Sequence, residues 1–74
     1  MEKLLVILRD IDPDVDYENE TALIDDGILD SMEVLELVST LEDEFDIEVT
    51  PTELVPANFN SAESMWKMIG RLQG

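Results

Sequence analysis

The feature that most constrains the fold is the spacing of apolar residues between positions 31 and 45. Along this stretch they recur three, four, seven and eleven positions after the first, which is the spacing of one face of an α-helix. Such residues fall within a narrow arc around the helix axis, so a helix here must bury that arc against other elements. The members of this stripe are Val34, Leu37, Val38, Leu41 and Phe45.

A capping pattern marks the start of this helix. Asp30 can accept hydrogen bonds from the free backbone N–H groups of a first helical turn, and Glu33 follows three positions later, as in a capping box. We therefore predict a helix that begins at Ser31 and ends at Phe45 or Asp46.

Two further helices are predicted toward the ends of the chain. Apolar residues at helical spacing over residues 2–11 indicate an amphipathic helix, which the run Asp12-Pro13-Asp14 stops. A second capping pattern over residues 60–63 predicts a last helix over residues 61–72. The expected inward residues are Leu4, Leu5, Leu8 and Ile11 in the first helix and Met65, Met68, Ile69 and Leu72 in the last, with Phe59 and Trp66 adding aromatic bulk to the core.

The connecting segments are less regular. Thr50, Pro51 and Glu53 combine a capping residue, a proline at the first helical position and an acid three after the cap, which predicts a short third helix that Pro56 ends. Residues 12–30 are rich in Asp, Asn and Glu and predict a long loop, a feature that is often functional in a compact domain. The predicted fold is all-α: a single domain over residues 1–74, built as a small bundle of three main helices plus one short helix.

The composition excludes most kinds of chemistry. Without cysteine or histidine, the chain lacks the thiolate and imidazole groups that most nucleophiles and transition-metal sites require. We therefore expect neither enzymatic activity nor a metal site. No apolar run is long enough to span a bilayer, and Glu2 and Arg9 bracket the short N-terminal one. We expect a cytoplasmic monomer that does not insert into membranes.

Charge is distributed unevenly along the chain. The formal net charge is −15, and the four basic residues lie near the two ends, so residues 10–66 carry acids but no cation. This distribution would repel nucleic acid. The acids can simply keep the surface solvated, or they can steer basic partner proteins toward it.

Two apolar residues of the central helix fall outside its core stripe. Met32 and Leu35 project well away from that stripe, on a side shared with Ser39. Glu36 and Asp43 lie beside them, which makes a small apolar patch rimmed by carboxylates. Such a patch suits a transient partner with a basic, shallow apolar groove. The alternative is that Met32 and Leu35 pack under the preceding loop.

Ser31 stands at the N-terminus of the central helix. Unpaired backbone N–H groups and the positive end of the helix dipole favour a phosphate ester on a hydroxyl placed there. Serine is also an ordinary residue at a helix start, where its hydroxyl can cap the backbone. Position alone leaves both roles open.

A family resemblance separates these roles. Residues 26–32, Asp-Gly-Ile-Leu-Asp-Ser-Met, resemble the attachment motif of the acyl carrier protein and peptidyl carrier family, in which Asp-Ser followed by Leu or Met accepts 4′-phosphopantetheine. Residues 36–38, 41–49 and 56–61 also resemble the corresponding stretches of that family. The similarity covers nearly the whole chain over residues 22–72.

The resemblance implies a carrier protein rather than a catalyst. Ser31 would bear covalent 4′-phosphopantetheine, whose sulfur would hold an acyl or aminoacyl group as a thioester. The implied partners are a phosphopantetheinyl transferase, an adenylate-forming acyl or aminoacyl ligase, and downstream acyl-accepting enzymes. The surface they would recognise consists of Asp30, Met32, Leu35, Glu36, Ser39 and Asp43.

The resemblance also bears on the cargo. The Asp-Ser-Met form, together with residues 47–49 and 58–61, is most similar to stand-alone carriers of the D-alanyl type and to free-standing peptidyl carriers. Carriers of fatty-acid synthesis more often have Asp-Ser-Leu. Because a change between Leu and Met is mild in volume and polarity, a carrier role in fatty-acid or polyketide synthesis stays open.

Two alternative functions belong to other classes, a calcium-binding module and an interaction module. Asp12, Asp14 and Asp16 fall on positions 1, 3 and 5 of an EF-hand loop, but Tyr17 stands where that loop needs Gly and Leu23 where it needs Glu. The second alternative is an acidic protein–protein interaction module that uses the central helix without a prosthetic group. Attachment of phosphopantetheine to the chain would distinguish a carrier from such a module.

Overall fold

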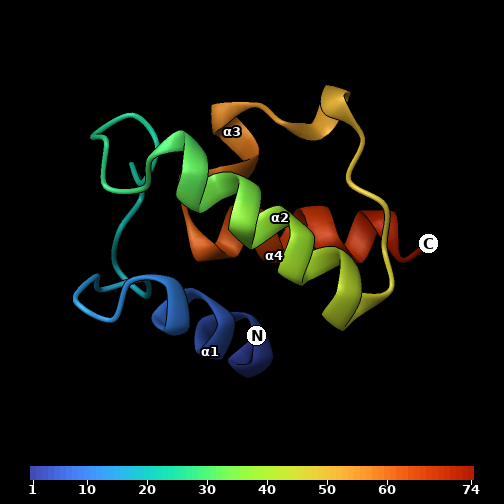
Figure 1. Ribbon diagram of the computed structural model, residues 1–74, viewed down its shortest axis with the longest axis horizontal. Coiled ribbons are helices and arrows are strands. Elements are labelled where there is room, and N and C mark those ends of the chain that lie inside the picture. The colour runs from blue at the N-terminus through green and yellow to red at the C-terminus, as the bar shows by residue number, and fades with distance from the viewer.

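The computed structural model describes all residues, 1–74, and every regular element in it is a helix. Three main helices carry the fold, and two shorter ones lie between the second and the last of them (Figure 1). This confirms the predicted all-α bundle. The elements are α1 (Glu2–Ile11), α2 (Ser31–Phe45), the 3₁₀ helix η1 (Pro51–Glu53), α3 (Pro56–Phe59) and α4 (Ala62–Leu72).

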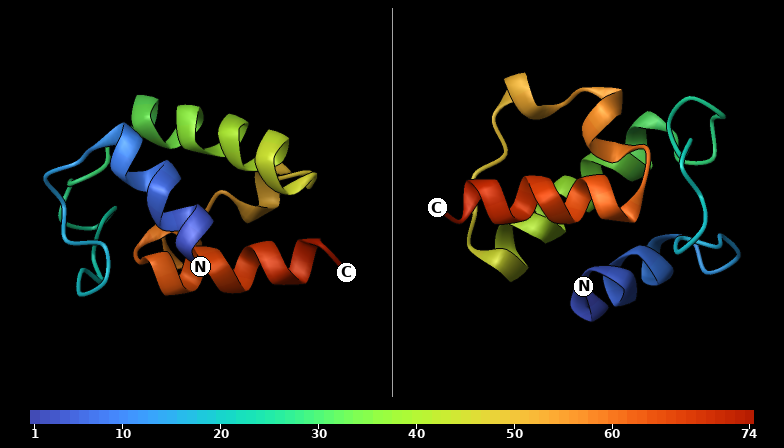
Figure 2. Two further views of the ribbon diagram at one scale, coloured as in Figure 1. Left: turned by 90° about the horizontal axis from the view of Figure 1, so that it is seen from below. Right: turned by 180° about the vertical axis from the view of Figure 1, so that it is seen from behind.

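The helices pack around a shared core. α1 contacts both α2 and α4, and α3 contacts α4. Figures 1 and 2 show α2 and α4 as the two longest helices, with the loop from α1 to α2 at one end of the molecule. None of the helices combines the length and the apolar character that a membrane crossing would need.

The core is apolar throughout. It holds 17 buried residues, and none of them is charged. The predicted stripe of α2 faces this core, with its three central residues buried and its two end residues partly buried. The predicted inward residues are buried at Leu4, Leu5, Leu8, Leu37, Val38, Leu41, Met65, Met68 and Ile69, while Ile11, Val34, Phe45 and Leu72 pack partly buried against them.

The segment between α2 and α4 differs from the prediction. Instead of one short helix that Pro56 ends, the 3₁₀ helix η1 ends at Glu53 and Pro56 begins α3. A proline at the first helical position lacks only an N–H group that has no partner there in any case, so proline can start a helix as well as stop one. The prediction that Pro56 is a terminator is therefore wrong. Phe59, the last residue of this extra helix, is 2% exposed, which confirms its predicted place in the core.

Trp66 is a second departure from the prediction. It was expected in the core, but its side chain is 39% exposed. Trp66 follows the buried Met65, so it is rotated by about 100° from the inner stripe of α4. Its ring covers the edge of the core and meets Phe45 edge-on, with the ring centroids 6.0 Å apart.

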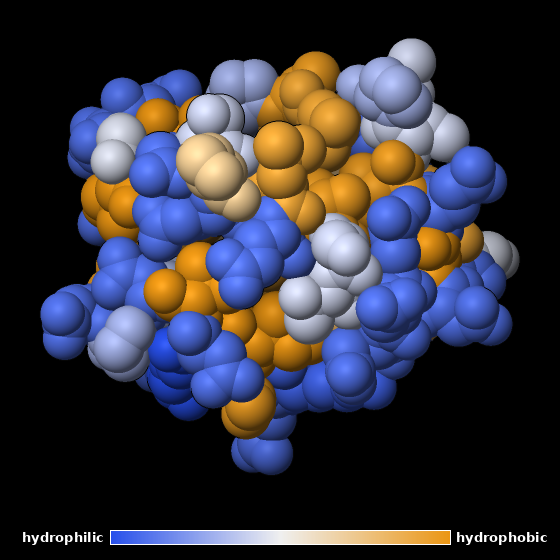
Figure 3. All heavy atoms as spheres, in the orientation of Figure 1, coloured by the Kyte–Doolittle hydropathy of each residue, from blue (hydrophilic) through white to orange (hydrophobic).

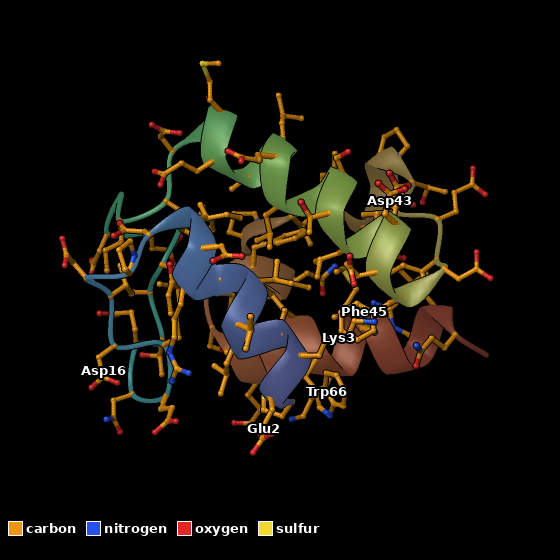
Figure 4. All side chains as sticks on the ribbon, turned by 60° about the horizontal axis from the view of Figure 1, so that its bottom comes forward. Glu2, Lys3, Asp16, Asp43, Phe45 and Trp66 are labelled. Atoms are coloured by element: carbon orange, nitrogen blue, oxygen red, sulfur yellow. The ribbon has the colours of Figure 1, made fainter.

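Contacts from α1 and α4 close the C-terminal end of α2. Lys3 Nζ donates a hydrogen bond to the Glu44 carbonyl at 2.7 Å and lies 5.1 Å from the centre of the Phe45 ring. Figure 4 shows Lys3, Phe45 and Trp66 gathered at this end. A cation beside the last carbonyls of a helix, together with packed aromatic rings, stabilises the helix end. Asp46 then ends α2 in the left-handed conformation, with a φ of 52°.

Residues 12–30 form the predicted loop without regular structure. Tyr17, Leu23 and Leu29 are buried and anchor this loop to the core. The Tyr17 hydroxyl donates a hydrogen bond to the Asp12 carbonyl at 2.9 Å. Burial, with help from the negative charges of Asp12 and Glu33, raises the pKa of Tyr17 to about 12.

Candidate functional site

Ser31 is the first residue of α2, and it is exposed. Its neighbour Asp30 caps the helix: Asp30 Oδ1 accepts a hydrogen bond from the Glu33 N–H at 2.8 Å, and Glu33 Oε1 accepts one from the Asp30 N–H at 3.3 Å. This capping box confirms the predicted helix start. Because Asp30 fills the capping role, Ser31 is not needed for it and stands at the surface beside the positive end of the helix dipole.

An apolar pocket of about 380 Å³ lies beside Ser31. Its walls come from four parts of the chain: the long loop, the first turns of α2, the segment after η1, and α3. Asp30 and Ser31 are the only lining residues with polar side chains. Such a pocket can cover an apolar group, and it offers no cation to a buried anion. The lining residues are Ile24, Leu29, Asp30, Ser31, Val34, Leu35, Leu54, Val55, Pro56 and Phe59.

Exposed apolar side chains border this pocket. Met32 is 78% exposed and Leu35 is 62% exposed, so the alternative in which they pack under the preceding loop is wrong. Leu54 and Val55 are also exposed. Figure 3 shows hydrophobic side chains gathered on this face, between the start of α2 and the segment that leads to α3. Sequence reasoning missed Leu54 and Val55, although they begin an uninterrupted apolar run, Leu54-Val55-Pro56-Ala57, that could have indicated them.

The residues of the predicted partner surface are all exposed; five of them lie in α2, and Asp30 is its N-cap. Positions 32, 36, 39 and 43 are spaced by four, three and four residues, so they share one face of the helix. Figure 4 shows Asp43 on the side of α2 that points away from Lys3, Phe45 and Trp66. Their part in binding stays a prediction. We call this strip the acidic face; its six members, all exposed, are Asp30, Met32, Leu35, Glu36, Ser39 and Asp43.

The pocket wall that contains Leu54 and Val55 is held in place by its neighbours. Arg71 of α4 donates two hydrogen bonds to the Glu53 carboxylate, at 2.7 and 2.9 Å, and Asn58 Nδ2 donates one to the Glu53 carbonyl at 2.8 Å. The hydrogen bonds and the charge of Arg71 lower the pKa of Glu53 below its ordinary value. This arrangement fixes the chain immediately before Leu54.

Asp12, Asp14 and Asp16 do not converge on a metal site, since no group of three or more acidic side chains in the chain is placed to hold an ion. The acids of this loop make local contacts instead. Asp12 Oδ1 accepts a hydrogen bond from the Asp14 N–H at 3.2 Å, and Asp16 Oδ2 accepts one from Asn19 Nδ2 at 2.8 Å. The geometry gives the calcium alternative no support.

Comparison with known proteins finds similar sequences. The family model described as "Phosphopantetheine attachment site" matches residues 2–69. The acyl carrier protein of Buchnera aphidicola subsp. Baizongia pistaciae is 37% identical over 51 residues, which cover 69% of this chain and 63% of that protein. Aminoacyl carrier protein 2 of Bradyrhizobium diazoefficiens is 41% identical over 54 residues, which cover 73% of this chain and 60% of that protein. Each match therefore spans less than two thirds of the relative's own length, and no solved structure gives a significant match.

Proposed function

The chain belongs to the phosphopantetheine attachment-site family, and we propose that it is a carrier protein with 4′-phosphopantetheine attached to Ser31. When bound, this group supplies a thiol that holds an acyl or aminoacyl group as a thioester. The observation that carries the proposal is the exposed Ser31 at the start of a capped helix, beside an apolar pocket. A chain without cysteine would thus obtain its sulfur from the prosthetic group.

The residues around Ser31 fit such a group. The first turn of α2 offers free backbone N–H groups and the positive end of a helix dipole to a phosphate. The exposure of Ser31 leaves its hydroxyl within reach of a modifying enzyme. The apolar walls formed by Leu35, Leu54 and Val55 can cover apolar parts of the arm or of its cargo.

The cargo is proposed as an acyl or aminoacyl group. The two relatives are named as an acyl carrier and an aminoacyl carrier, so between them they favour neither class. The Asp-Ser-Met form of the motif supports an aminoacyl or specialised acyl cargo, of which D-alanyl is one example. The whole chain over residues 1–74 would act as a single carrier domain, since its three main helices share one core.

The proposed partners act on the carrier, which is their substrate and performs no catalysis of its own. A phosphopantetheinyl transferase would modify Ser31, an adenylate-forming ligase would load the thiol, and downstream enzymes would accept the cargo. The acidic face supports this role because it combines exposed apolar side chains with carboxylates and contains no cation. A cytoplasmic location is part of the same proposal.

Loading of the purified chain tests the proposal. Incubation with coenzyme A and a broad-specificity phosphopantetheinyl transferase is expected to raise the intact mass by one phosphopantetheine. Ser31→Ala should abolish the increase. Thr21→Ala, which removes an exposed hydroxyl from the long loop, should keep it. No increase in the native chain would contradict the carrier function and favour the acidic interaction module.

Salt tests the proposed role of the acidic face. The KM of the carrier for the transferase should rise with ionic strength, because salt screens the attraction between exposed carboxylates and a basic partner. Glu36→Gln should weaken this dependence, whereas Glu48→Gln, an exposed change outside the acidic face, should leave it as it is. A KM that does not change with salt would contradict electrostatic steering by this face.

A further inference from the structure

Asn60 lies between α3 and α4 and binds the long loop through its side chain and its backbone carbonyl. Asn60 Oδ1 accepts hydrogen bonds from the N–H groups of Ile24 and Asp25, both at 3.0 Å. Asn60 Nδ2 donates to Asp25 Oδ2 at 3.1 Å, and the Asn60 carbonyl accepts from the Leu23 N–H at 2.9 Å. The contacts of the side chain span 35 or 36 residues of sequence. Three consecutive loop residues are therefore held by one residue that is distant in the chain.

Asn60 is itself firmly placed. It follows Phe59, which is 2% exposed in the core, and its N–H donates a hydrogen bond to the Pro56 carbonyl at 2.9 Å at the end of α3. The next residue, Ser61, caps α4 by accepting a hydrogen bond from the Ser64 N–H at 3.0 Å. Because Asn60 joins two helices that are both anchored, its side chain can hold the loop in a fixed place.

A short series of contacts connects the held segment to Ser31. The carbonyl of Leu23 accepts a hydrogen bond from the N–H of Leu29 at 2.9 Å. Leu29 is 3% exposed and directly precedes Asp30, the residue that caps α2. Leu29 also lines the pocket beside Ser31. Ile24, which the Asn60 side chain holds directly, lines the same pocket, so the side chain of Asn60 positions the loop wall beside Ser31.

We propose that Asn60 is a positioning residue for the attachment site, which holds the loop so that the transferase meets Ser31 in one orientation. The inference rests on the proposed function of Ser31 and extends it to a residue that does not line the Ser31 pocket. Without the Asn60 side chain, the N–H groups of Ile24 and Asp25 turn to water and the loop gains conformational freedom. Binding to the transferase must then restore that order, which raises KM and leaves kcat nearly unchanged.

Reversing the polarity of the Asn60–Asp25 pair separates positioning from a general loss of structure. Asn60→Ala removes every side-chain contact, and we expect the KM of the carrier for the transferase to rise about tenfold. Asn60→Asp keeps the acceptor for the two N–H groups but sets a second carboxylate against Asp25, so KM should also rise. Adding Asp25→Asn to Asn60→Asp restores a donor and an acceptor in the reverse direction. The double variant should return to within about twofold of the native KM.

Asn19→Ala provides the matched control. Its side chain also donates to an aspartate of the long loop, Asp16, but this contact spans only 3 residues. We expect Asn19→Ala to load with the native KM. Amide hydrogen exchange at Ile24 and Asp25 should accelerate in Asn60→Ala and stay slow in Asn19→Ala, and circular dichroism identifies a temperature at which all variants are folded.

Three outcomes would count against the proposal. A native KM in Asn60→Ala despite fast exchange at Ile24 and Asp25 would overturn it. An equal rise in Asn19→Ala, or a double variant that stays as weak as Asn60→Asp, would overturn it as well, because either result indicates general damage to the loop. A native chain that accepts no phosphopantetheine is a different result, which overturns the proposed function and the positioning role with it.

Discussion

The two ends of α2 differ in how much of their surface is packed. At the C-terminal end, Lys3 bonds to the Glu44 carbonyl and Phe45 packs edge-on against Trp66. At the N-terminal end, Ser31 and Met32 are exposed, and loops supply half of the residues that line the neighbouring pocket. The contrast teaches that a small domain can anchor a helix at one end and leave the other end accessible. We call these the closed end and the open end of α2. Side chains packed in the core should control stability, and exposed side chains at the open end should control recognition.

The largest expected effect comes from two leucines of α2. Leu37 is 0% exposed and Leu35 is 62% exposed. Leu37→Ala should lower the free energy of unfolding by about 3 kcal/mol, because it leaves a cavity in the core. Leu35→Ala should change it by less than about 0.5 kcal/mol but raise the KM for loading, since Leu35 belongs to the acidic face. Urea denaturation measures the free energy of unfolding. Equal destabilisation by the two variants would contradict the difference between packed and exposed side chains of α2.

The next effect concerns the cap at the open end. Asp30→Ala should lower the free energy of unfolding by about 1 kcal/mol, because the Glu33 N–H loses its acceptor. Asp30→Asn keeps an acceptor and should retain most of that stability. It also removes one charge from the acidic face, so loading at low salt should weaken. Thermal unfolding and loading kinetics measure the two effects, and native loading by Asp30→Asn would show that this charge takes no part in recognition.

Tyr17 is one of the buried residues of the long loop, and pH provides a test of its burial. The folded chain raises the pKa of Tyr17 from 10.0 to about 12, so the folded state holds the phenolic proton more tightly than the unfolded state does. The resulting stabilisation is complete below the unfolded pKa of 10.0 and is lost as the pH rises through the folded pKa of about 12. Tyr17→Phe should make this alkaline loss of stability shallower.

The same variant should cost about 1 kcal/mol near neutral pH, because the hydrogen bond to the Asp12 carbonyl disappears. Equilibrium unfolding at a series of pH values measures both effects. A phenolate absorbance titration of the folded native chain with its midpoint at 10 would contradict the burial of the Tyr17 hydroxyl.

The smallest expected effect is at the closed end. Lys3→Gln should lower the free energy of unfolding by about 0.5 kcal/mol, because it removes a cation from the last carbonyls of α2. Lys67→Gln is the matched control, since Lys67 makes only an exposed ion pair with Glu63 at 3.4 Å. The difference in unfolding free energy between Lys3→Gln and Lys67→Gln should become smaller at high salt. Neither change should alter loading, and a rise in KM for Lys3→Gln would mean that the closed end also takes part in recognition.

The main helices were predictable because their signals are local. The stripe from Val34 to Phe45 and the cap at Asp30 depend on residues within a few turns of each other. The role of Pro56 could not be predicted because proline has two opposite effects on a helix. Its missing N–H and its ring end a preceding helix, its fixed φ suits the start of a following one, and no neighbouring residue decides between them. The prediction for Trp66 was wrong because position on the helix, one residue off the buried stripe of α4, determines its exposure more than the size of its side chain does.

The candidate site was predictable only in part. The exposure of Met32 and Leu35 followed from helical geometry, and Ser31 was singled out by its motif. The other pocket walls come from Leu54 and Val55, which reach the site through a segment with no periodic pattern. The contacts of Asn60 with the loop join residues 35 or 36 positions apart, and such pairings depend on the tertiary fold.

The central claim is that Ser31 carries the prosthetic group. The most direct measurement is tandem mass spectrometry of the protein isolated from its own cells, with the attached mass mapped to a single residue. The account predicts a phosphopantetheine, with or without cargo, on the fragment that contains Ser31 and on no other serine or threonine. A fully unmodified Ser31, or the same group on another residue, would contradict it.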